Sequence, residues 1–334
     1  MKKLICVLLS VLMALTAVAF VGCEGKKDES VKLGLGIYTT IAQATNADAD
    51  ANGKGQATMT AAVVTLDAAG KIVACQLDVA DITVEYTGDG KAIANDSFKT
   101  KYETGKDYGM VAYGGSAKEW YEQADAFEGV VSGKTLDEVK ALVAGENKGN
   151  DEVIAAGCTI AINEFVQAIE KAVANAVDFS ATTANTVKLG VHTEQTTKDA
   201  VEDATGYNQI ETTFFAAAVD ADGKIVAAAS DCVQVQFTFD AAGASTFDTA
   251  KAVSSKREAG ANYGMSQWGT DLNGDGTVKE WFEQADAFNA LCVGKTASEV
   301  VALCASDNYG TDEVKAAGCT IMVNGLTKAA AKIV

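Results

Sequence analysis

Proline is absent from this 334-residue sequence, and histidine occurs once, at His192. Without proline, Gly, Asn and Asp must form the turns, and the 31 glycines are enough for this. A single histidine and the lack of any Cys-x-x-Cys pair exclude the common zinc, haem and iron–sulfur motifs. The sequence also has no phosphate loop and no Gly-x-Ser-x-Gly nucleophile. We therefore expect no catalytic residues of a conventional hydrolase.

Basic residues are scarce as well. The chain has 27 Lys and Arg against 45 Asp and Glu, which gives a net charge of −18. Binding to nucleic acid depends on neutralising phosphates with Lys and Arg, so we do not expect nucleic acid as a partner. After the first 23 residues, no stretch approaches the ~20 apolar residues that a membrane-spanning helix needs.

Residues 1–23 have the pattern of an export signal. Lys2 and Lys3 precede an apolar run, which ends in Phe20-Val21-Gly22-Cys23 and is followed by polar residues. This ending resembles the lipobox of bacterial lipoproteins, although Phe20 stands where that family usually has Leu. The resemblance implies lipidation of Cys23, a tether over residues 24–30, and a protein anchored on the extracytoplasmic face of the cell membrane. An ordinary secretory signal or a transmembrane anchor is the alternative.

The rest of the chain consists of two similar repeats. Residues 31–177 form a first repeat and residues 186–334 a second one. The block from Lys118 to Phe127, for example, returns as Lys279 to Phe288 with one change, Tyr121 to Phe282. A repeat of this length predicts two copies of a globular domain rather than a solenoid.

Each repeat is predicted to begin with strands and end with helices. In the first repeat, alternating apolar residues indicate strands at 57–66, 71–79 and 82–86. Helices are expected at 117–130, from Thr135, where Glu138 completes a capping box, and after Asn163. Trp120 and Trp281 stand in an aromatic stripe typical of a helix core. Glu119, Glu122 and Asp125 form an acidic face expected to be solvated. The predicted fold is α+β, an antiparallel sheet covered on one face by helices.

Six cysteines remain in the mature chain, namely Cys75, Cys158, Cys232, Cys292, Cys304 and Cys319. Only Cys158 and Cys319 occupy equivalent places in the two repeats, so a shared disulfide framework is not indicated. Two interpretations stay open for Cys292 and Cys304, which either pair with each other or remain buried free thiols.

One insert in the second repeat is similar to the start of a calcium-binding loop. Asp271, Asn273 and Asp275 fit the first three ligand positions of an EF-hand, and Gly276 fits the turn. Phe282 stands where the bidentate carboxylate belongs, so a plain polar loop is the alternative.

The most conspicuous shared stretch runs from Asp151 to Ile160 and returns from Asp312 to Ile321 with a single change. It contains Gly157-Cys158-Thr159 and Gly318-Cys319-Thr320, which we expect to form a turn leading into a short strand. Small residues around each threonine leave room beside its hydroxyl, and the amides of such a turn can hold a phosphate. Alternatively, the glycines only make a necessary turn.

A domain that opens with hairpins carrying Asp-x-x-Gly-Lys-Ile-Val and closes with small-Gly-small-Thr before a final helix resembles the FMN-binding domain family. A lipobox followed by two such domains is similar to the flavinylated lipoproteins of extracellular electron transfer. In that family a flavin transferase moves FMN from FAD onto the last Thr or Ser of a Ser-Gly-Ala-Thr motif. Ala156 and Ala317 replace the motif's Ser, and Cys158 and Cys319 replace its Ala.

The resemblance implies covalent FMN on Thr159 and Thr320, in sites that include Gly157, Gly318, Cys158 and Cys319. The protein would then be an electron carrier rather than a catalyst, with a flavin transferase and a redox partner at the membrane. The alternative is a cofactor-free, lipid-anchored binding or structural module of the cell surface.

Overall fold

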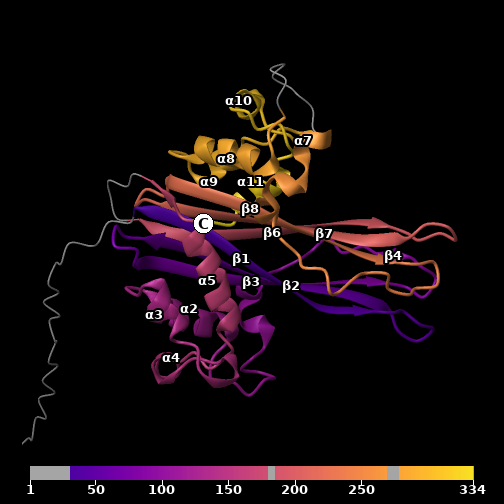
Figure 1. Ribbon diagram of the computed structural model, residues 1–334, viewed down its shortest axis with the longest axis horizontal. Helices are drawn as coiled ribbons and strands as arrows, with labels where there is room; N and C mark the ends of the chain where they lie inside the picture. Colours follow the sequence, from indigo (N-terminus) through magenta and orange to yellow (C-terminus); the bar gives the residue numbers. More distant parts are fainter. Residues whose placement is uncertain (1–30, 180–184, 269–277, 334) are drawn as a thin grey trace, which may run out of the picture.

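A computed structural model of the protein describes residues 31–179, 185–268 and 278–333 (Figure 1). Cys23 and the insert with Asp271, Asn273 and Asp275 lie outside the described residues. Within those ranges, no helix combines the length and the apolar character needed to cross a membrane.

The first repeat forms an antiparallel sheet whose three main strands are β1 (Lys32–Thr45), β2 (Gly53–Leu66) and β3 (Ile72–Tyr86). Two short edge strands, β4 (Ala92–Ile93) and β5 (Val177–Asp178), complete the order β4-β3-β2-β1-β5. The prediction of separate strands at 71–79 and 82–86 was wrong. The register between β2 and β3 runs unbroken through Ala80 and Asp81, so these residues continue one long strand.

The second repeat forms an antiparallel sheet of matching strands, β6 (Thr186–Lys198), β7 (Gly206–Val219) and β8 (Ile225–Phe239), in the order β6-β7-β8. As in the first repeat, long hairpins connect the strands, and both sheets extend beyond their helices (Figure 1). The fold is therefore mixed α+β, as the sequence predicts.

Helices cover one face of each sheet. On the first sheet these are α1 (Lys101–Thr104), η1 (Gly105–Tyr108), α2 (Trp120–Val131), α3 (Leu136–Lys140), η2 (Gly145–Asn147), α4 (Asp151–Ala156) and α5 (Asn163–Ala174). On the second sheet they are α6 (Lys256–Ala259), η3 (Gly260–Tyr263), α7 (Met265–Trp268), α8 (Trp281–Cys292), α9 (Ala297–Val301), α10 (Asp312–Ala316) and α11 (Asn324–Ala330). The expected capping box is present, because Thr135 accepts from the Glu138 amide and donates its own amide to the Glu138 carboxylate.

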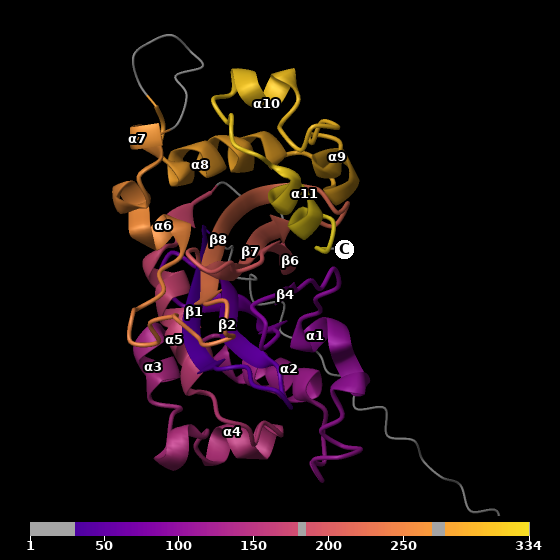
Figure 2. The ribbon, with the colours of Figure 1, turned by 90° about the vertical axis from the view of Figure 1, so that its right-hand side faces the viewer.

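The two sheets pack face to face, so the molecule has four layers, helix–sheet–sheet–helix (Figures 1 and 2). Residues of both repeats share the apolar core between the sheets, including Leu35, Met59, Ile82, Phe214 and Phe237. Each repeat has a second core between its sheet and its own helices. The sequence predicts helices on only one face of each sheet. The other face is buried against the sheet of the other repeat.

Contacts between the repeats are reciprocal. Tyr86 and its counterpart Phe239 stack on each other with ring centroids 4.2 Å apart. The amide of Ala47 donates to Gly243, and the matching amide of Ala200 donates to Gly90. Lys171 pairs with Glu258, and their counterparts Lys332 and Glu103 pair in the same way. Such two-way contacts define an isologous interface, which relates the repeats by an approximate two-fold axis.

Candidate functional site

The shared stretch forms a helix that ends in a tight turn. In the first repeat, α4 stops at Gly157, whose φ of 103° is left-handed. The amides of Gly157 and Cys158 donate back to Ile154 and Val153, which is the hydrogen-bond pattern of a Schellman cap. Gly318 makes the same turn after α10, with φ 94°. The helices α4 and α10, which precede these turns, lie at opposite ends of the layered molecule (Figure 2).

After the turn, the predicted short strand is not formed. Ala161 makes a single bridge to Lys148, and α5 begins two residues later, at Asn163. The backbone amide of Thr159 donates instead to the side chain of a buried glutamine on α2.

Each threonine is held by this glutamine. The amide and the hydroxyl of Thr159 both donate to Oε1 of Gln123, at 2.8 and 3.0 Å. The amide and hydroxyl of Thr320 donate in the same way to Gln284, at 2.8 and 2.9 Å. The hydroxyl proton therefore points into the protein, while Thr159 is exposed and Thr320 half-buried.

The glutamine is itself fixed. Gln123 is 1% exposed and Gln284 is 3% exposed. The Gln123 side-chain amide donates to the Ser116 hydroxyl and to the Lys118 carbonyl, both at 3.1 Å. Because its donors are already engaged, the glutamine presents its oxygen to the threonine.

A lysine lies over each turn. The ammonium of Lys118 donates to the Ala156 carbonyl at 3.4 Å. A Cβ placed on Gly157 would lie 2.1 Å from that ammonium, and a Cβ on Gly318 would lie 2.3 Å from the ammonium of Lys279. Glycine is thus needed here both for its left-handed φ and for the approach of the lysine. An ammonium has three donors, so Lys118 retains capacity for an anion beside Thr159.

The expectation that the turn amides hold a phosphate was wrong. The amides of Gly157, Cys158 and Thr159 all donate to groups of the protein, so none is directed at a ligand. An anion at this turn would meet Lys118 instead.

The two motif cysteines do not face the same space as the threonines. Cys158 and Cys319, which we expected in the cofactor site, are fully buried in the cores between sheet and helices. Burial raises the pKa of the Cys158 thiol to about 11 and that of Cys319 to about 12. Such thiols are protonated and contribute packing. All six cysteines in the described ranges, Cys292 and Cys304 included, are free.

Aromatic residues form one wall beside each motif. Trp120 is buried, as the helix core prediction requires, and contacts Phe165 edge to face. In the second repeat Trp281 and Met265 share a cluster with the partly buried Tyr263 and with Ile321, the neighbour of Thr320. Met110, the counterpart of Met265, lies 4.0 Å from the Gln123 amide nitrogen.

On the acidic face predicted to be solvated, Glu122 and Asp125 are exposed, but Glu119 is not. Glu119 is buried and accepts hydrogen bonds from the amides of Met110 and Val111, and Glu280 does the same for Met265 and Ser266. Glu119 and Glu280 are the N-cap residues of α2 and α8. They therefore hold the loops at Met110 and Met265 against the first turns of these helices.

Sequence reasoning missed Gln123, Gln284, Lys118 and Lys279 as site residues. A signal was present, since all four belong to the block that is nearly identical in the two repeats. Packing of the tryptophans in the helix core is sufficient to explain that identity, so the sequence alone does not single out these four residues.

We expect Gly157→Ala to lower the free energy of unfolding by about 1–2 kcal/mol, because alanine is strained at left-handed φ and its Cβ would displace Lys118. Urea denaturation measures this change. Gly129→Ala on α2 is the matched control, because its Cβ meets open space and should leave stability equal or slightly higher. Equal stabilities of the two variants would contradict the prediction.

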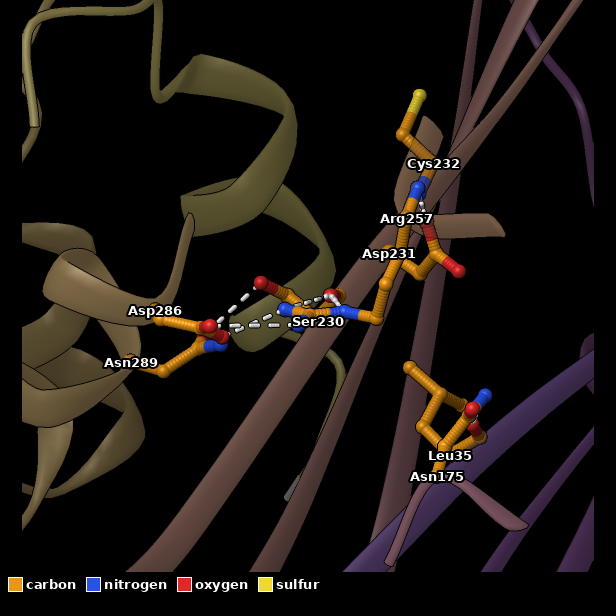
Figure 3. A network of polar contacts seen from close by, with 8 residues as sticks. All are labelled: Leu35, Asn175, Ser230, Asp231, Cys232, Arg257, Asp286 and Asn289. Atoms are coloured by element: carbon orange, nitrogen blue, oxygen red, sulfur yellow. Dashed lines mark hydrogen bonds and ion pairs between the residues drawn. The ribbon is translucent and has the colours of Figure 1, made fainter. Parts of the chain in front are cut away.

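A second polar network lies in a cleft of about 310 Å³ between the repeats (Figure 3). Arg257 pairs with Asp286 at 2.7 Å and donates to the Ser230 carbonyl. Asp231 accepts from the amides of Arg257 and Cys232. Burial raises the pKa of Asp231 to about 6.

Comparisons with protein-family models, with curated proteins and with solved structures found no match.

Proposed function

We propose that the protein is a membrane-anchored flavoprotein that carries FMN covalently on Thr159 and Thr320 and relays electrons to an extracellular acceptor. The observation that carries the proposal is the arrangement around each threonine. In both repeats the threonine follows a tight turn that a lysine covers, and its hydroxyl donates to a buried glutamine. In the second repeat its neighbour Ile321 packs in the cluster of Trp281.

The residues fit a phosphate-linked aromatic group. Lys118 and Lys279 supply positive charge where the phosphate of such a group would be attached, and an ammonium stabilises a phosphate by charge-assisted hydrogen bonds. The exposed Tyr108 and the half-buried Tyr263, next to the buried Trp120 and Trp281, offer ring surface to which a flat ring system can pack. Bound FMN would supply one- and two-electron chemistry, and the protein would position it.

Attachment requires a flavin transferase. In the proposed modification the threonine oxygen forms a bond to the FMN phosphorus of FAD, the bond between the two phosphates breaks, and AMP leaves with release of the hydroxyl proton. Gln123 would orient the hydroxyl as a positioning residue. The lipid on Cys23 would keep the carrier at the extracytoplasmic face of the membrane, close to its redox partner.

A cofactor-free surface module is the second candidate. It is favoured by the bond from each threonine hydroxyl to its glutamine, because this bond accounts for the threonine as an anchor of the turn without any ligand.

Intact mass separates the two candidates. After co-expression with a flavin transferase, we expect two additions of roughly 440 Da each, the mass of FMN less water. Thr159→Ala or Thr320→Ala should remove one addition, and the double variant should remove both. Thr→Ser at either position should retain the addition, because serine keeps the hydroxyl. An unmodified mass in the native host and after co-expression would refute the flavin carrier.

A further inference from the structure

Each repeat places a lysine against its aromatic wall. In the first repeat, the ammonium of Lys101 lies 5.2 Å from the ring centre of Tyr108 and 6.0 Å from that of Trp120. In the second repeat, the ammonium of Lys256 lies 5.2 Å from Tyr263 and 5.6 Å from Trp281. These are cation–π distances, and the two lysines occupy equivalent positions at the start of α1 and α6.

The charges around the two lysines differ. Lys256 is 6% exposed and pairs with Glu211 at 2.6 Å. Lys101 is half-buried, and no ion pair within 4.0 Å joins it to a carboxylate of the described residues. The position of Glu211 in the sheet register belongs to Thr58 in the first repeat.

Two carboxylates of the first repeat, Asp81 and Glu103, form other contacts and no ion pair with Lys101. Asp81, opposite Thr58 on β3, accepts from Gln56 at 2.7 Å and from Thr58 at 3.1 Å. Glu103 on α1 pairs with Lys332 at 2.6 Å. The ammonium of Lys101 thus lies against the aromatic wall without a paired carboxylate. The charge of Lys256 is offset by Glu211.

We propose that the two repeats hold their flavins at different reduction potentials, and that the flavin of the first repeat has the higher one. This inference rests on the proposed function. Reduction by two electrons and one proton adds one negative charge to a flavin. The unpaired ammonium of Lys101 stabilises that charge, whereas the Lys256–Glu211 pair is neutral overall and does so less. The electrons come from a reduced partner at the membrane, and in the experiment they come from dithionite.

The experiment compares two full-length proteins that each carry one flavin. Thr320→Ala leaves the first site loaded and Thr159→Ala leaves the second. A potentiometric titration with dithionite, followed by the flavin absorbance, measures each midpoint potential. We expect the first site to be higher by at least a tenfold change in the electron-exchange equilibrium constant, which is about 30 mV for a two-electron couple.

Substitutions exchange the charge environments. Thr58→Glu with Asp81→Gln keeps the net charge but moves the carboxylate to the position that pairs with the lysine in the second repeat, so it should lower the potential of the first site. Lys101→Gln should lower it as well, without placing a new charge in the sheet. Glu211→Gln should raise the potential of the second site. Lys140→Gln, on the exposed face of α3, is the matched control and should leave both potentials unchanged.

The outcomes separate this inference from the proposed function. Equal potentials in two fully flavinylated proteins, or potentials that do not move with Lys101 and Glu211, would overturn the inference alone. Absence of the flavin mass on both threonines would overturn the proposed function itself.

Discussion

Phe237→Ala should lower the free energy of unfolding by about 3–5 kcal/mol. The ring is 1% exposed and lies on β8 in the core that the two sheets share. Removing it leaves a cavity between the repeats, where neither sheet can close the gap alone. Urea denaturation followed by circular dichroism measures the loss. Gln236→Ala, one residue earlier on the exposed face, should change stability by no more than about 0.5 kcal/mol.

The partner of this ring is a glycine of the other repeat. A Cβ on Gly55 would lie 2.3 Å from Cγ of Phe237, so Gly55→Ala should overpack the core and cost about 1–3 kcal/mol. In the double variant the ring is gone and the new methyl group fills part of the cavity. We therefore expect the double variant to lose less stability than the sum of the two single variants. Additive losses would mean that the two residues do not meet.

Asp231→Asn should stabilise the protein at pH 8 by up to about 3 kcal/mol and have little effect at pH 4. Burial raises the pKa of Asp231 from 3.8 to about 6, while hydrogen bonds from Ser255, Arg257 and Cys232 oppose the rise. A difference of about two pKa units corresponds to about 3 kcal/mol. Asparagine keeps the acceptor oxygen for the two amides and removes the buried charge.

The sign follows from proton binding. Between pH 4 and pH 6 the folded protein holds the Asp231 proton more tightly than the unfolded chain does. Its stability therefore falls as the pH rises through this window, and the cost is complete above pH 6. In the asparagine variant this contribution to the pH dependence disappears.

Urea denaturation at each pH from 4 to 8 tests the expectation. Asp78→Asn should behave alike, because burial raises the pKa of Asp78 to about 6 at the equivalent place in the first repeat. Asp50→Asn, at an exposed position, is the control. A difference between Asp231→Asn and the natural protein that is constant over the whole pH range would refute the argument.

Local sequence patterns were sufficient for much of the fold. Spacing and capping placed α2, α3 and α5 within a few residues, because these features depend on neighbours in the chain. The packing of the two sheets was not foreseen. A period of two shows which face of a strand is apolar, but it does not say what covers the other face. The second half of β2 is buried at every position from Met59 to Leu66. Its nearly continuous run of small and apolar residues was the available sign of a strand covered on both faces.

The candidate site was predicted only in part. The turn at Gly157 and the accessible Thr159 follow from adjacent residues. The contact of Thr159 with Gln123 joins positions 36 residues apart, and the approach of Lys118 to Gly157 depends on how α2 lies on the sheet. Neither contact leaves a periodic pattern in the sequence, because these residues meet only in the folded chain.

The reciprocal contacts between the repeats have a consequence for assembly. Their geometry is that of a symmetric dimer, but both partners belong to one polypeptide. An ordinary dimer separates on dilution, because its stability depends on protein concentration. Here the short connection between Asp178 and Thr186 keeps the two halves at a high effective concentration. The paired arrangement therefore persists in a single isolated molecule, whatever the protein concentration.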